Sequence, residues 1–270
     1  MDYYAVVGNP VGHSKSPMIH AMFAQQTNQD LNYGKIEAPL DAFSESVNTF
    51  FAQKNQKGLN ITVPFKEQAW SLCQERTERA ELAGAVNTLY LSKNNKLCGD
   101  NTDGVGLVSD LKNNGIVLKN KKILIVGAGG AVRGVLQPIL KEMPECVVVC
   151  NRTLSKADEL VSIFKHLGNI RSSAFEAVND AYDLVINGTS ASLSGNLPPL
   201  PVKVIKPETV TYDMMYSKDA TVFNGWAKQY GASKTIDGLG MLVEQAAEAF
   251  DIWRGVKPQT TEVMETLRAL

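Results

Sequence analysis

The stretch KILIVGAGGAVRG, Lys122 to Gly134, decides the fold predicted for this chain. An apolar run of strand length leads into a cluster of glycines, and a helical pattern follows that cluster. Glycine tolerates a tight turn from strand to helix and leaves the first N–H groups of the helix unobstructed. The stretch therefore predicts a strand, a glycine loop and a helix, which together open an α/β unit.

The glycine loop has the residue types that a phosphate-binding turn needs. A helix N-terminus carries free N–H groups and a partial positive charge, and both attract phosphate. With a strand before it and a helix after it, the loop favours nucleotide binding over a plain tight turn or a methyltransferase loop. Val132 stands where Gly, Ala or Ser would allow close packing, so we expect a helix slightly further from its strand. The loop consists of Gly127, Ala128, Gly129, Gly130 and Ala131.

The second strand of this unit, CVVVCN at residues 146–151, ends in Asn151, Arg152 and Thr153. NAD-binding units usually carry an acid at this point, where it binds the ribose hydroxyls. An arginine there offers a planar set of donors to a 2′-phosphate instead, and Asn151 and Thr153 could add neutral hydrogen bonds. The strand end therefore favours NADP as the cofactor, although a solvated arginine is the simpler alternative.

Composition excludes several classes of protein. The 270 residues are 44% apolar and 20% charged, which is typical of a globular protein with room for two domains. Lys plus Arg number 27 and Asp plus Glu 28, so no strong field of one sign recruits nucleic acid or an anionic membrane. The opening MDYYAVVG is no signal peptide, and no apolar run reaches the length of a membrane span.

Cysteine and histidine usage argues against a metal site. The cysteines form no CxxC pair and no metal-ligand spacing, so reduced thiols in a cytoplasmic protein are expected. With only three histidines, a histidine-rich metal site is not expected either. The four cysteines are Cys73, Cys98, Cys146 and Cys150.

Strand and helix patterns alternate along the whole chain and predict an α/β fold with two domains. All-apolar strands in the second half indicate a parallel sheet covered on both faces. We expect one domain at 1–102 plus 239–270, with the last helices packed back on the first domain, and the other at 103–238. The expected strands are 4–8, 31–38, 58–63, 85–91, 96–99, 122–127, 146–151, 182–188, 210–215 and a short one near 233–236. The expected helices are 16–26, 41–53, 105–115, 131–141, 155–167, 239–253 and 260–270, and 190–201 is expected to be a surface loop.

Three stretches of the first half combine polar residue types that suit a small anionic ligand. GNPVGHSKSPMIH (8–20) has alternate serines before a helix start, LNITVPFK (59–66) ends in Lys66, and GDNTDG (99–104) contains Asp103. Helix capping by serine and aspartate and a solvated lysine are the simpler structural readings. Serines beside free N–H groups would, however, also hold a carboxylate.

Together these stretches resemble the shikimate dehydrogenase family over essentially the whole chain. The resemblance is carried by GNPVGHSKSP (8–17), NITVPFK (60–66), GAVNT (84–88), GDNTDG (99–104), GAGGA (127–131), NRT (151–153), YDMMY (212–216), DGLGML (237–242) and EQAAEAF (244–250). It implies an open α/β substrate domain, a Rossmann-like NADP-binding domain and a cleft between them. The implied reaction is the reversible reduction of 3-dehydroshikimate to shikimate with NADPH, in the pathway to chorismate and the aromatic amino acids.

The resemblance also implies a role for individual residues. Lys66 is the implied catalytic lysine and Asp103 its acidic partner at the substrate. The implied substrate-binding residues are Ser14, Ser16, Thr62, Asn87, Asp103, Tyr216 and Gln245. Besides the glycine loop and Asn151 to Thr153, the implied cofactor residues are Met214, Gly238 and, at a weaker family position, Glu78.

The residue chemistry supports this interpretation independently. Hydride transfer to a ketone builds negative charge on oxygen, and a lysine ammonium can stabilise that charge and supply a proton. The alternatives are a quinate or dual quinate/shikimate dehydrogenase of broader cofactor or substrate range, a nucleotide-binding regulatory module and a methyltransferase. We expect a small-molecule substrate, no nucleic acid, no membrane, no metal, and a monomer or homodimer.

Overall fold

The computed structural model describes residues 1–191 and 195–270, so the expected surface loop at 190–201 lies partly outside the described residues. The chain divides into two compact units, Met1–Gly106 with Val243–Leu270 and Leu107–Leu242. The division falls inside two helices, α5 (Asp103–Asn113) and α9 (Leu239–Arg254). The boundaries expected from the sequence lie four residues earlier at both connections, at 102/103 and 238/239 rather than 106/107 and 242/243.

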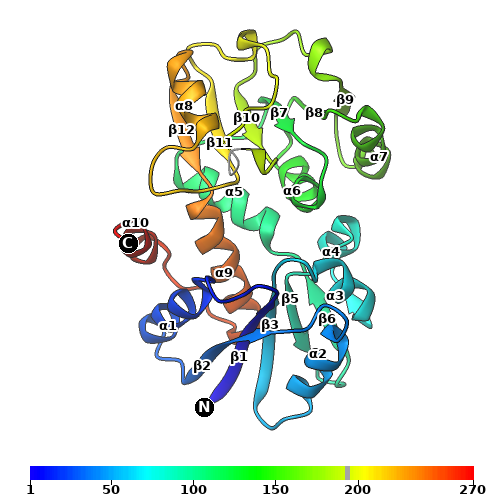
Figure 1. The fold of residues 1–270 in the computed structure, drawn as a ribbon, viewed down its shortest axis with the longest axis vertical. Helices are drawn as coiled ribbons and strands as arrows, with labels where there is room; N and C mark the ends of the chain where they lie inside the picture. Colours follow the sequence, from blue (N-terminus) through cyan, green and yellow to red (C-terminus); the bar gives the residue numbers. More distant parts are fainter. Residues whose placement is uncertain (192–194) are drawn as a thin grey trace. The chain divides into compact units, whose positions relative to one another are not determined.

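Unit 1 is built on a mixed six-stranded sheet in the order β2-β1-β3-β5-β6-β4, with β1 between β2 and β3 in Figure 1. β1 pairs in parallel with β2 and β3, and β5 and β6 form an antiparallel hairpin. Its strands are β1 (Asp2–Gly8), β2 (Leu31–Glu37), β3 (Gln56–Ile61), β4 (Glu75–Arg76), β5 (Thr88–Leu91) and β6 (Leu97–Asp100). Its helices, besides parts of α5 and α9, are α1 (Ser16–Gln26), α2 (Phe43–Phe51), α3 (Lys66–Leu72), α4 (Glu78–Ala83) and α10 (Thr261–Arg268).

Apolar side chains fix the position of the strands that lead to the polar residues of unit 1. Phe65, next to Lys66, stacks on Phe43 of α2 with ring centroids 4.7 Å apart, and both rings are fully buried. α9 packs on β3, where a Cβ at Gly58 would lie 2.4 Å from the Trp253 ring. Burial of such aromatic rings is the main stabilising contribution here. It holds the ends of β3 and β6 in place.

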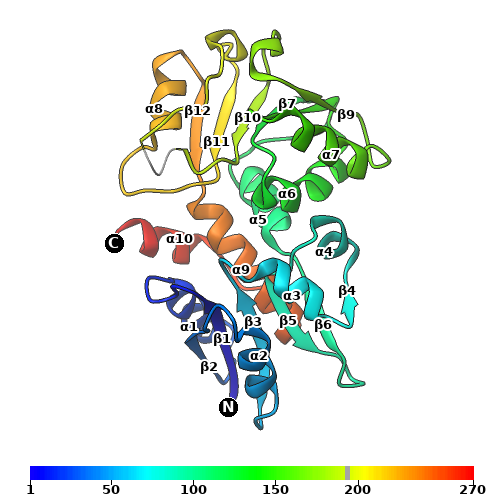
Figure 2. The same cartoon turned by 45° about the vertical axis from the view of Figure 1, so that its right-hand side comes forward.

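Unit 2 has a six-stranded parallel sheet in the order β12-β11-β10-β7-β8-β9, of which Figure 2 labels all strands except β8. Counted from β7, this is the order 3-2-1-4-5-6 of the Rossmann fold. Its strands are β7 (Lys122–Val126), β8 (Cys146–Cys150), β9 (Ile170–Ser173), β10 (Leu184–Asn187), β11 (Val210–Asp213) and β12 (Lys234–Asp237). Its helices, besides parts of α5 and α9, are α6 (Gly130–Lys141), α7 (Leu154–Phe164) and α8 (Val222–Gln229), with short 3₁₀ turns η1 (Phe175–Ala177) and η3 (Val202–Val204).

The parallel sheet of unit 2 is covered on both faces, as the apolar strands predict. Successive side chains of a strand point to opposite faces, and all four from Ile123 to Val126 of β7 are fully buried. Val132 finds its space through a glycine on another strand end, since a Cβ at Gly188 would lie 2.4 Å from the Val132 methyl. The small residue missing from the glycine loop is therefore supplied from the end of β10.

The expected strands and helices are present, with ends that differ by a few residues, and Gly115 ends α5 with a φ of +78°. The helices α3, α4 and α8 and the strands β4 and β9 were not expected. These elements are two to eight residues long. Such short segments carry little periodic pattern, and their stability comes from tertiary packing rather than from propensity.

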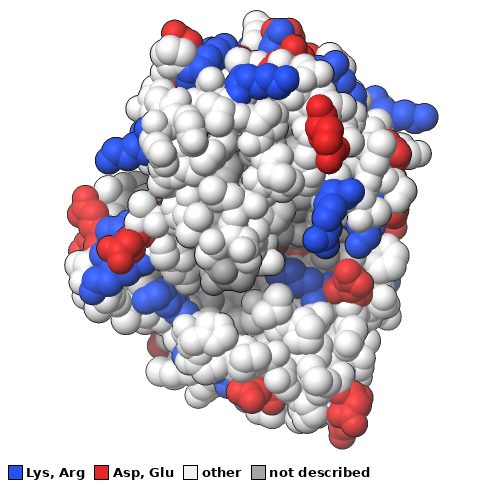
Figure 3. All heavy atoms as spheres, turned by 45° about the horizontal axis from the view of Figure 1, so that its top comes forward, with Lys and Arg blue, Asp and Glu red and all other residues white. Residues whose placement is uncertain are grey.

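On the face drawn in Figure 3, basic and acidic side chains are interspersed over a largely uncharged surface. Among the described residues, no helix combines the length and apolar character needed to cross a membrane. The four cysteines are all buried and unpaired.

Candidate functional site

Lys66 lies where β3 turns into α3, and it is the first residue of that helix. The turn is closed by a hydrogen bond from the Phe65 N–H to the Thr62 carbonyl, and the Val86 N–H donates to the Lys66 carbonyl. An ammonium group at a helix N-terminus is disfavoured by the helix dipole, so it gains from a nearby carboxylate. The fold supplies one from the beginning of α5.

The Asp103 carboxylate contacts both Lys66 and Asn87. Its Oδ2 lies 2.6 Å from Lys66 Nζ, and its Oδ1 accepts from Asn87 Nδ2 at 2.8 Å. The lysine side chain is 30% exposed and that of Asp103 is 15% exposed, so the pair is accessible to a small molecule. The Asp103 carboxylate thus binds Lys66 and Asn87 rather than capping α5, while the Asp103 N–H donates to Asn101 Oδ1.

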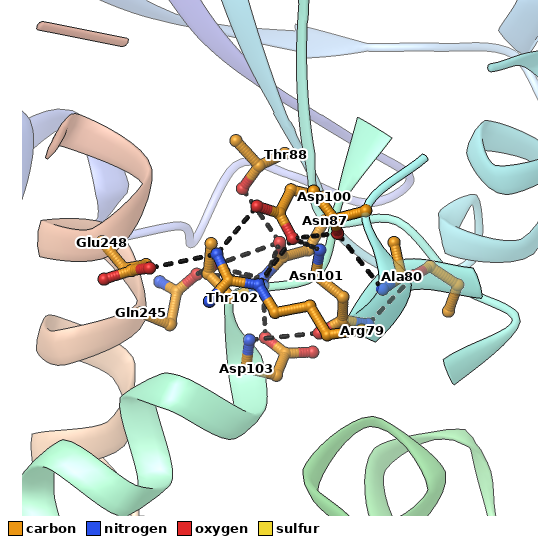
Figure 4. Close-up of polar contacts among 12 residues, drawn as sticks. Arg79, Ala80, Asn87, Thr88, Asp100, Asn101, Thr102, Asp103, Gln245 and Glu248 are labelled. Atoms are coloured by element: carbon orange, nitrogen blue, oxygen red, sulfur yellow. Dashed lines mark hydrogen bonds and ion pairs between the residues drawn. The ribbon is translucent and has the colours of Figure 1, made fainter. Parts of the chain in front are cut away.

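Asn87 joins the ends of three strands of unit 1. Its carbonyl accepts from the Ile61 N–H, and its N–H donates to the Asp100 carbonyl. Figure 4 shows its side chain among those of Thr102, Asp103 and Gln245. The Asn87 Nδ2 lies 2.9 Å from Thr102 Oγ1 and 3.3 Å from Gln245 Oε1. Residues 87, 103 and 245 thus meet although they are far apart in sequence.

The two serines lie at the beginning of α1, but neither is its N-cap residue, which is Lys15. Ser14 Oγ accepts from the Ser16 N–H at 3.3 Å and lies 3.2 Å from Ser16 Oγ. Burial raises the pKa of Tyr33 well above its ordinary value, while Ser16 opposes that rise.

Asn60 connects Tyr33 to Asn87. The Tyr33 hydroxyl donates to Asn60 Oδ1 at 2.7 Å, and Asn60 Nδ2 donates to the Asn87 carbonyl and to Thr88 Oγ1. Thr88 Oγ1 donates to Asn87 Oδ1 at 2.9 Å. Hydrogen bonds therefore connect Tyr33 with Lys66 through the side chains of Asn60, Thr88, Asn87 and Asp103.

The two remaining predicted residues of unit 1 are Thr62 and Glu78. Thr62 packs its methyl group against Gly8, where a Cβ would lie 2.4 Å away. Glu78 is the first residue of α4, behind the N-cap Thr77. Their predicted roles toward substrate and cofactor stay predictions.

In unit 2 the predicted phosphate loop runs from the end of β7 into the first turn of α6. Gly127 has a φ of +107°, a conformation that glycine adopts without strain, and Gly129 is the N-cap residue of α6. No atom lies within 4 Å of a Cβ built on Gly129 or Gly130. Since Gly129 has no side chain to cap the helix, the first N–H groups of α6 are available to an anion, and the loop fits a dinucleotide pyrophosphate.

Asn151, Arg152 and Thr153 lie between β8 and α7, one strand away from the glycine loop. The Gly127 N–H donates to the Cys150 carbonyl at 2.8 Å, which fixes the loop against the end of β8. Asn151 Nδ2 donates to the Thr153 carbonyl at 2.9 Å. The Arg152 side chain is exposed and, within the described part of the chain, forms no ion pair. Its guanidinium is therefore available for a phosphate.

Met214 and Gly238 lie in direct contact at the carboxyl ends of β11 and β12. A Cβ at Gly238 would lie 2.2 Å from the Met214 carbonyl oxygen, and the Met214 sulfur lies 3.2 Å from a Cβ built on Gly188. Tyr216 follows two residues later and is 38% exposed. Burial, and then the charge of Asp237, raise the pKa of its hydroxyl.

The sequence interpretation missed five side chains that complete the network of unit 1. Four of them lie inside quoted motifs, so a polar residue next to a motif position was the available signal. Tyr33 carried no such signal, because it lies in a separate edge strand. The missed residues are Tyr33, Asn60, Thr88, Asn101 and Thr102.

Across 1–191 and 195–270, no group of three or more His, Cys, Asp or Glu side chains could hold a metal ion.

Three family models match the chain in order. Residues 6–89 match the shikimate dehydrogenase substrate binding domain, 110–194 match shikimate / quinate 5-dehydrogenase, and 238–268 match the shikimate 5'-dehydrogenase C-terminal domain. These ranges cover most of the chain and both units.

Individual relatives agree over their full length. A shikimate dehydrogenase (NADP(+)) from Marinobacter nauticus is 58% identical over 271 residues, covering 99% of this chain and 98% of the relative. One from Hahella chejuensis is 60% identical over 269 residues, covering 99% of each.

Among solved structures, an Ael1 enzyme from Pseudomonas putida has a TM-score of 0.95 at 46% identity, covering 99% of this chain and 98% of that one. Shikimate 5-dehydrogenase from Thermus thermophilus, in complex with NADP(H) and shikimate, has a TM-score of 0.88 at 32% identity, covering 100% and 99%. The chain therefore belongs to the shikimate dehydrogenase family.

Proposed function

We propose that this chain is an NADP-dependent shikimate dehydrogenase, which reversibly reduces 3-dehydroshikimate to shikimate in the pathway to chorismate and the aromatic amino acids. Its full-length relatives at 58% and 60% identity bear that name. The observation that carries the proposal is the ion pair of Lys66 with Asp103 at 2.6 Å, next to Asn87 and Gln245. A lysine and a carboxylate beside amide donors suit a hydroxylated ketone.

Lys66 acts as the general acid of the reduction. When the ketone of the substrate gains a hydride, its oxygen becomes an alkoxide, and the ammonium stabilises this charge and donates the proton. Asp103 keeps the ammonium oriented through the ion pair and accepts a hydrogen bond from a substrate hydroxyl. In the reverse direction, neutral Lys66 takes the proton from the hydroxyl of shikimate.

The other polar residues of unit 1 bind the substrate away from the reacting carbon. Ser14 and Ser16 hold its carboxylate at the N-terminal end of α1. Asn87, Gln245 and Thr62 bind ring hydroxyls, and the Tyr216 hydroxyl of unit 2 is assigned to the carboxylate. We thus assign substrate binding mainly to unit 1.

Unit 2 provides the binding residues for NADP, which supplies the hydride. The N–H groups of the glycine loop, Gly127 to Ala131, bind its pyrophosphate at the start of α6. Arg152, with Asn151 and Thr153, binds the 2′-phosphate. Met214 and Gly238 form the surface for the nicotinamide end, and Glu78 is a weaker candidate contact to the cofactor.

The test is a spectrophotometric assay with the purified chain, read at the absorbance band of reduced nicotinamide. Shikimate with NADP⁺ is expected to give a rapid rise, and NAD⁺ a much slower one because it lacks the 2′-phosphate. No NADP⁺ reduction with shikimate would refute the proposed function.

A second candidate substrate is quinate, because the model that matches residues 110–194 is described as shikimate / quinate 5-dehydrogenase. The same assay with quinate separates the two. A kcat/KM for quinate close to that for shikimate would favour the dual enzyme.

We also propose that the protein works in the cytoplasm, where its four unpaired, buried cysteines stay reduced. The expectation of a monomer or homodimer stays a prediction, which light scattering of the purified chain would test.

A further inference from the structure

Unit 1 contains a second ion pair, between Arg79 of α4 and Asp100, which ends β6 three residues before Asp103. The guanidinium binds the carboxylate through two bonds, Nε to Oδ1 at 2.6 Å and the second nitrogen to Oδ2 at 2.7 Å. The Asp100 side chain is only 5% exposed and that of Arg79 18%. Glu248 of α9 binds the same guanidinium at 3.0 Å, as Figure 4 shows.

A contribution to the stability of the fold does not by itself account for this ion pair. Taking two charges out of water carries a desolvation penalty that the ion pair often only offsets, and apolar residues of similar volume stabilise a core as well or better. Two-point binding by arginine does, however, fix the carboxylate in one orientation. The pair is therefore better suited to holding a geometry than to adding stability.

The geometry that the pair holds is the turn from β6 into α5. Asp100 Oδ1 accepts the Asn101 N–H at 2.7 Å and the Thr77 hydroxyl at 2.6 Å. Thr77 is the N-cap residue of α4, the helix that carries Arg79. The carboxylate thus joins the start of α4 to the turn.

Asn101 connects Asp100 to Asp103 through hydrogen bonds. Its side chain donates to the Ala85 carbonyl at 3.0 Å, and its Oδ1 accepts the Asp103 N–H at 3.1 Å. This bond fixes the backbone of Asp103, whose carboxylate binds Lys66 and Asn87.

We infer that Arg79 and Asp100 form a positioning pair for Asp103. They touch neither substrate nor cofactor, and they act by fixing the turn that aims the Asp103 carboxylate at Lys66. The inference rests on the proposed function, because it assigns the pair a role in the dehydrogenase reaction.

The test compares Asp100→Asn in two backgrounds, the wild-type chain and Asp103→Asn. Asparagine keeps the Oδ1 that accepts from Thr77 and Asn101, but its NH₂ group cannot bind the guanidinium. In the wild-type background we expect kcat for shikimate oxidation to fall by about 10- to 100-fold, since displacement of a catalytic group by about 1 Å can have that effect, and KM to change less. In the Asp103→Asn background we expect little further loss, because both changes act through one carboxylate.

The matched control is Asp2→Asn, which breaks the ion pair of Asp2 with Arg254 in the same unit. That pair has a similar chemistry but no bond to the turn at residues 100–103, so kcat is expected to stay nearly unchanged in both backgrounds. Thermal melts show whether each variant is folded. If Asp100→Asn does not fold, Arg79→Lys takes its place, because it keeps the charge and loses only the two-point geometry.

The outcomes separate the two proposals. An equal loss of kcat in both backgrounds, or no loss in the folded variant, would overturn the positioning role while wild-type activity upholds the dehydrogenase. A wild-type chain that does not oxidise shikimate would instead refute the proposed function itself. Single-turnover measurements at high enzyme concentration make the residual rate of Asp103→Asn readable.

Discussion

The ends of two strands, β6 in unit 1 and β8 in unit 2, hold charged residues in opposite ways. After β6, Asp100 is buried with four hydrogen bonds, and Asp103 binds Lys66 and Asn87. After β8, Arg152 is exposed beside a loop of glycines. Unit 1 fixes its functional groups through side chains that satisfy one another. In the proposed function, unit 2 instead uses backbone N–H groups and the charge of Arg152, whose partner is the cofactor.

This difference determines what a substitution changes. Preorganised groups in a side-chain network lose rate when one of them is removed, because each holds others at the reacting centre. A backbone loop tolerates most side-chain changes, but it is sensitive wherever a Cβ would meet another backbone. The following predictions test this contrast.

The largest effect is expected for Lys66→Met in unit 1. Methionine keeps much of the side-chain length but carries neither charge nor proton, so kcat should fall by about 10²–10⁴ from lost acid catalysis, and further from lost charge stabilisation. Steady-state kinetics with shikimate and NADP⁺ measure the change. Lys96→Met is the control, because Lys96 is an exposed lysine paired with Glu75. A near-normal kcat in Lys66→Met would show that Lys66 and its hydrogen-bonded neighbours have a structural rather than a catalytic role.

Arg152→Ala in unit 2 should change cofactor affinity alone. Loss of a charge-assisted contact of about 2 kcal/mol weakens NADP⁺ binding about thirtyfold and leaves NAD⁺ almost untouched. The readout is the ratio of kcat/KM for the two cofactors. Arg171→Ala serves as the control, since Arg171 is an exposed arginine of β9 paired with Asp180. An equal loss for both cofactors would assign Arg152 a structural role.

Gly238→Ala should destabilise the backbone contact of unit 2. The new Cβ would lie 2.2 Å from the Met214 carbonyl oxygen, so the chain must shift, at about 1–3 kcal/mol of unfolding free energy. Chemical denaturation measures this loss. Gly225→Ala is the matched control, because Gly225 lies in α8 with no atom within 4 Å of its Cβ and should be neutral or stabilising. Equal stability of both variants would contradict the close approach.

The smallest effect is expected for the pH dependence of the unfolding free energy, through His20, which packs against Tyr33 of unit 1. His20 is fully buried, stacks on Tyr33 with centroids 4.2 Å apart, and contacts the ring of Trp253. Burial lowers the pKa of His20 from 6.5 to about 3, with Asn60 opposing the shift. Between these values the unfolded chain binds a proton that the folded chain does not. The contribution of His20 to the free energy of unfolding is therefore fully present above pH 6.5. As the pH falls from 6.5 toward 3, this contribution decreases by about 1.4 kcal/mol per pH unit.

Unfolding free energies at pH 6, 5 and 4 measure this slope. His20→Phe keeps an aromatic ring against Tyr33 and should reduce the slope by the contribution of one proton. An unchanged slope in the variant would show that His20 is protonated in the folded chain.

Much of the candidate site was predictable because its residues lie in short motifs. Lys66, Asn87, Asp103 and Gln245 were named from such motifs, and in unit 1 they come together. Tyr33 and Arg79 were not, because each acts through partners on other segments. Nothing in the residues around Arg79 indicates a bond to Glu248, 169 positions away.

The sequence by itself determined the α/β class, the glycine loop, the charge at the end of β8 and the family. These properties depend on backbone preferences and residue types within a few neighbouring positions. Only the tertiary structure decided that Gly188 makes room for Val132, that the Asp103 carboxylate binds Lys66, and that Arg79 holds Asp100. Such contacts join distant segments, and they depend on how the buried faces of whole sheets and helices pack, which no local pattern records.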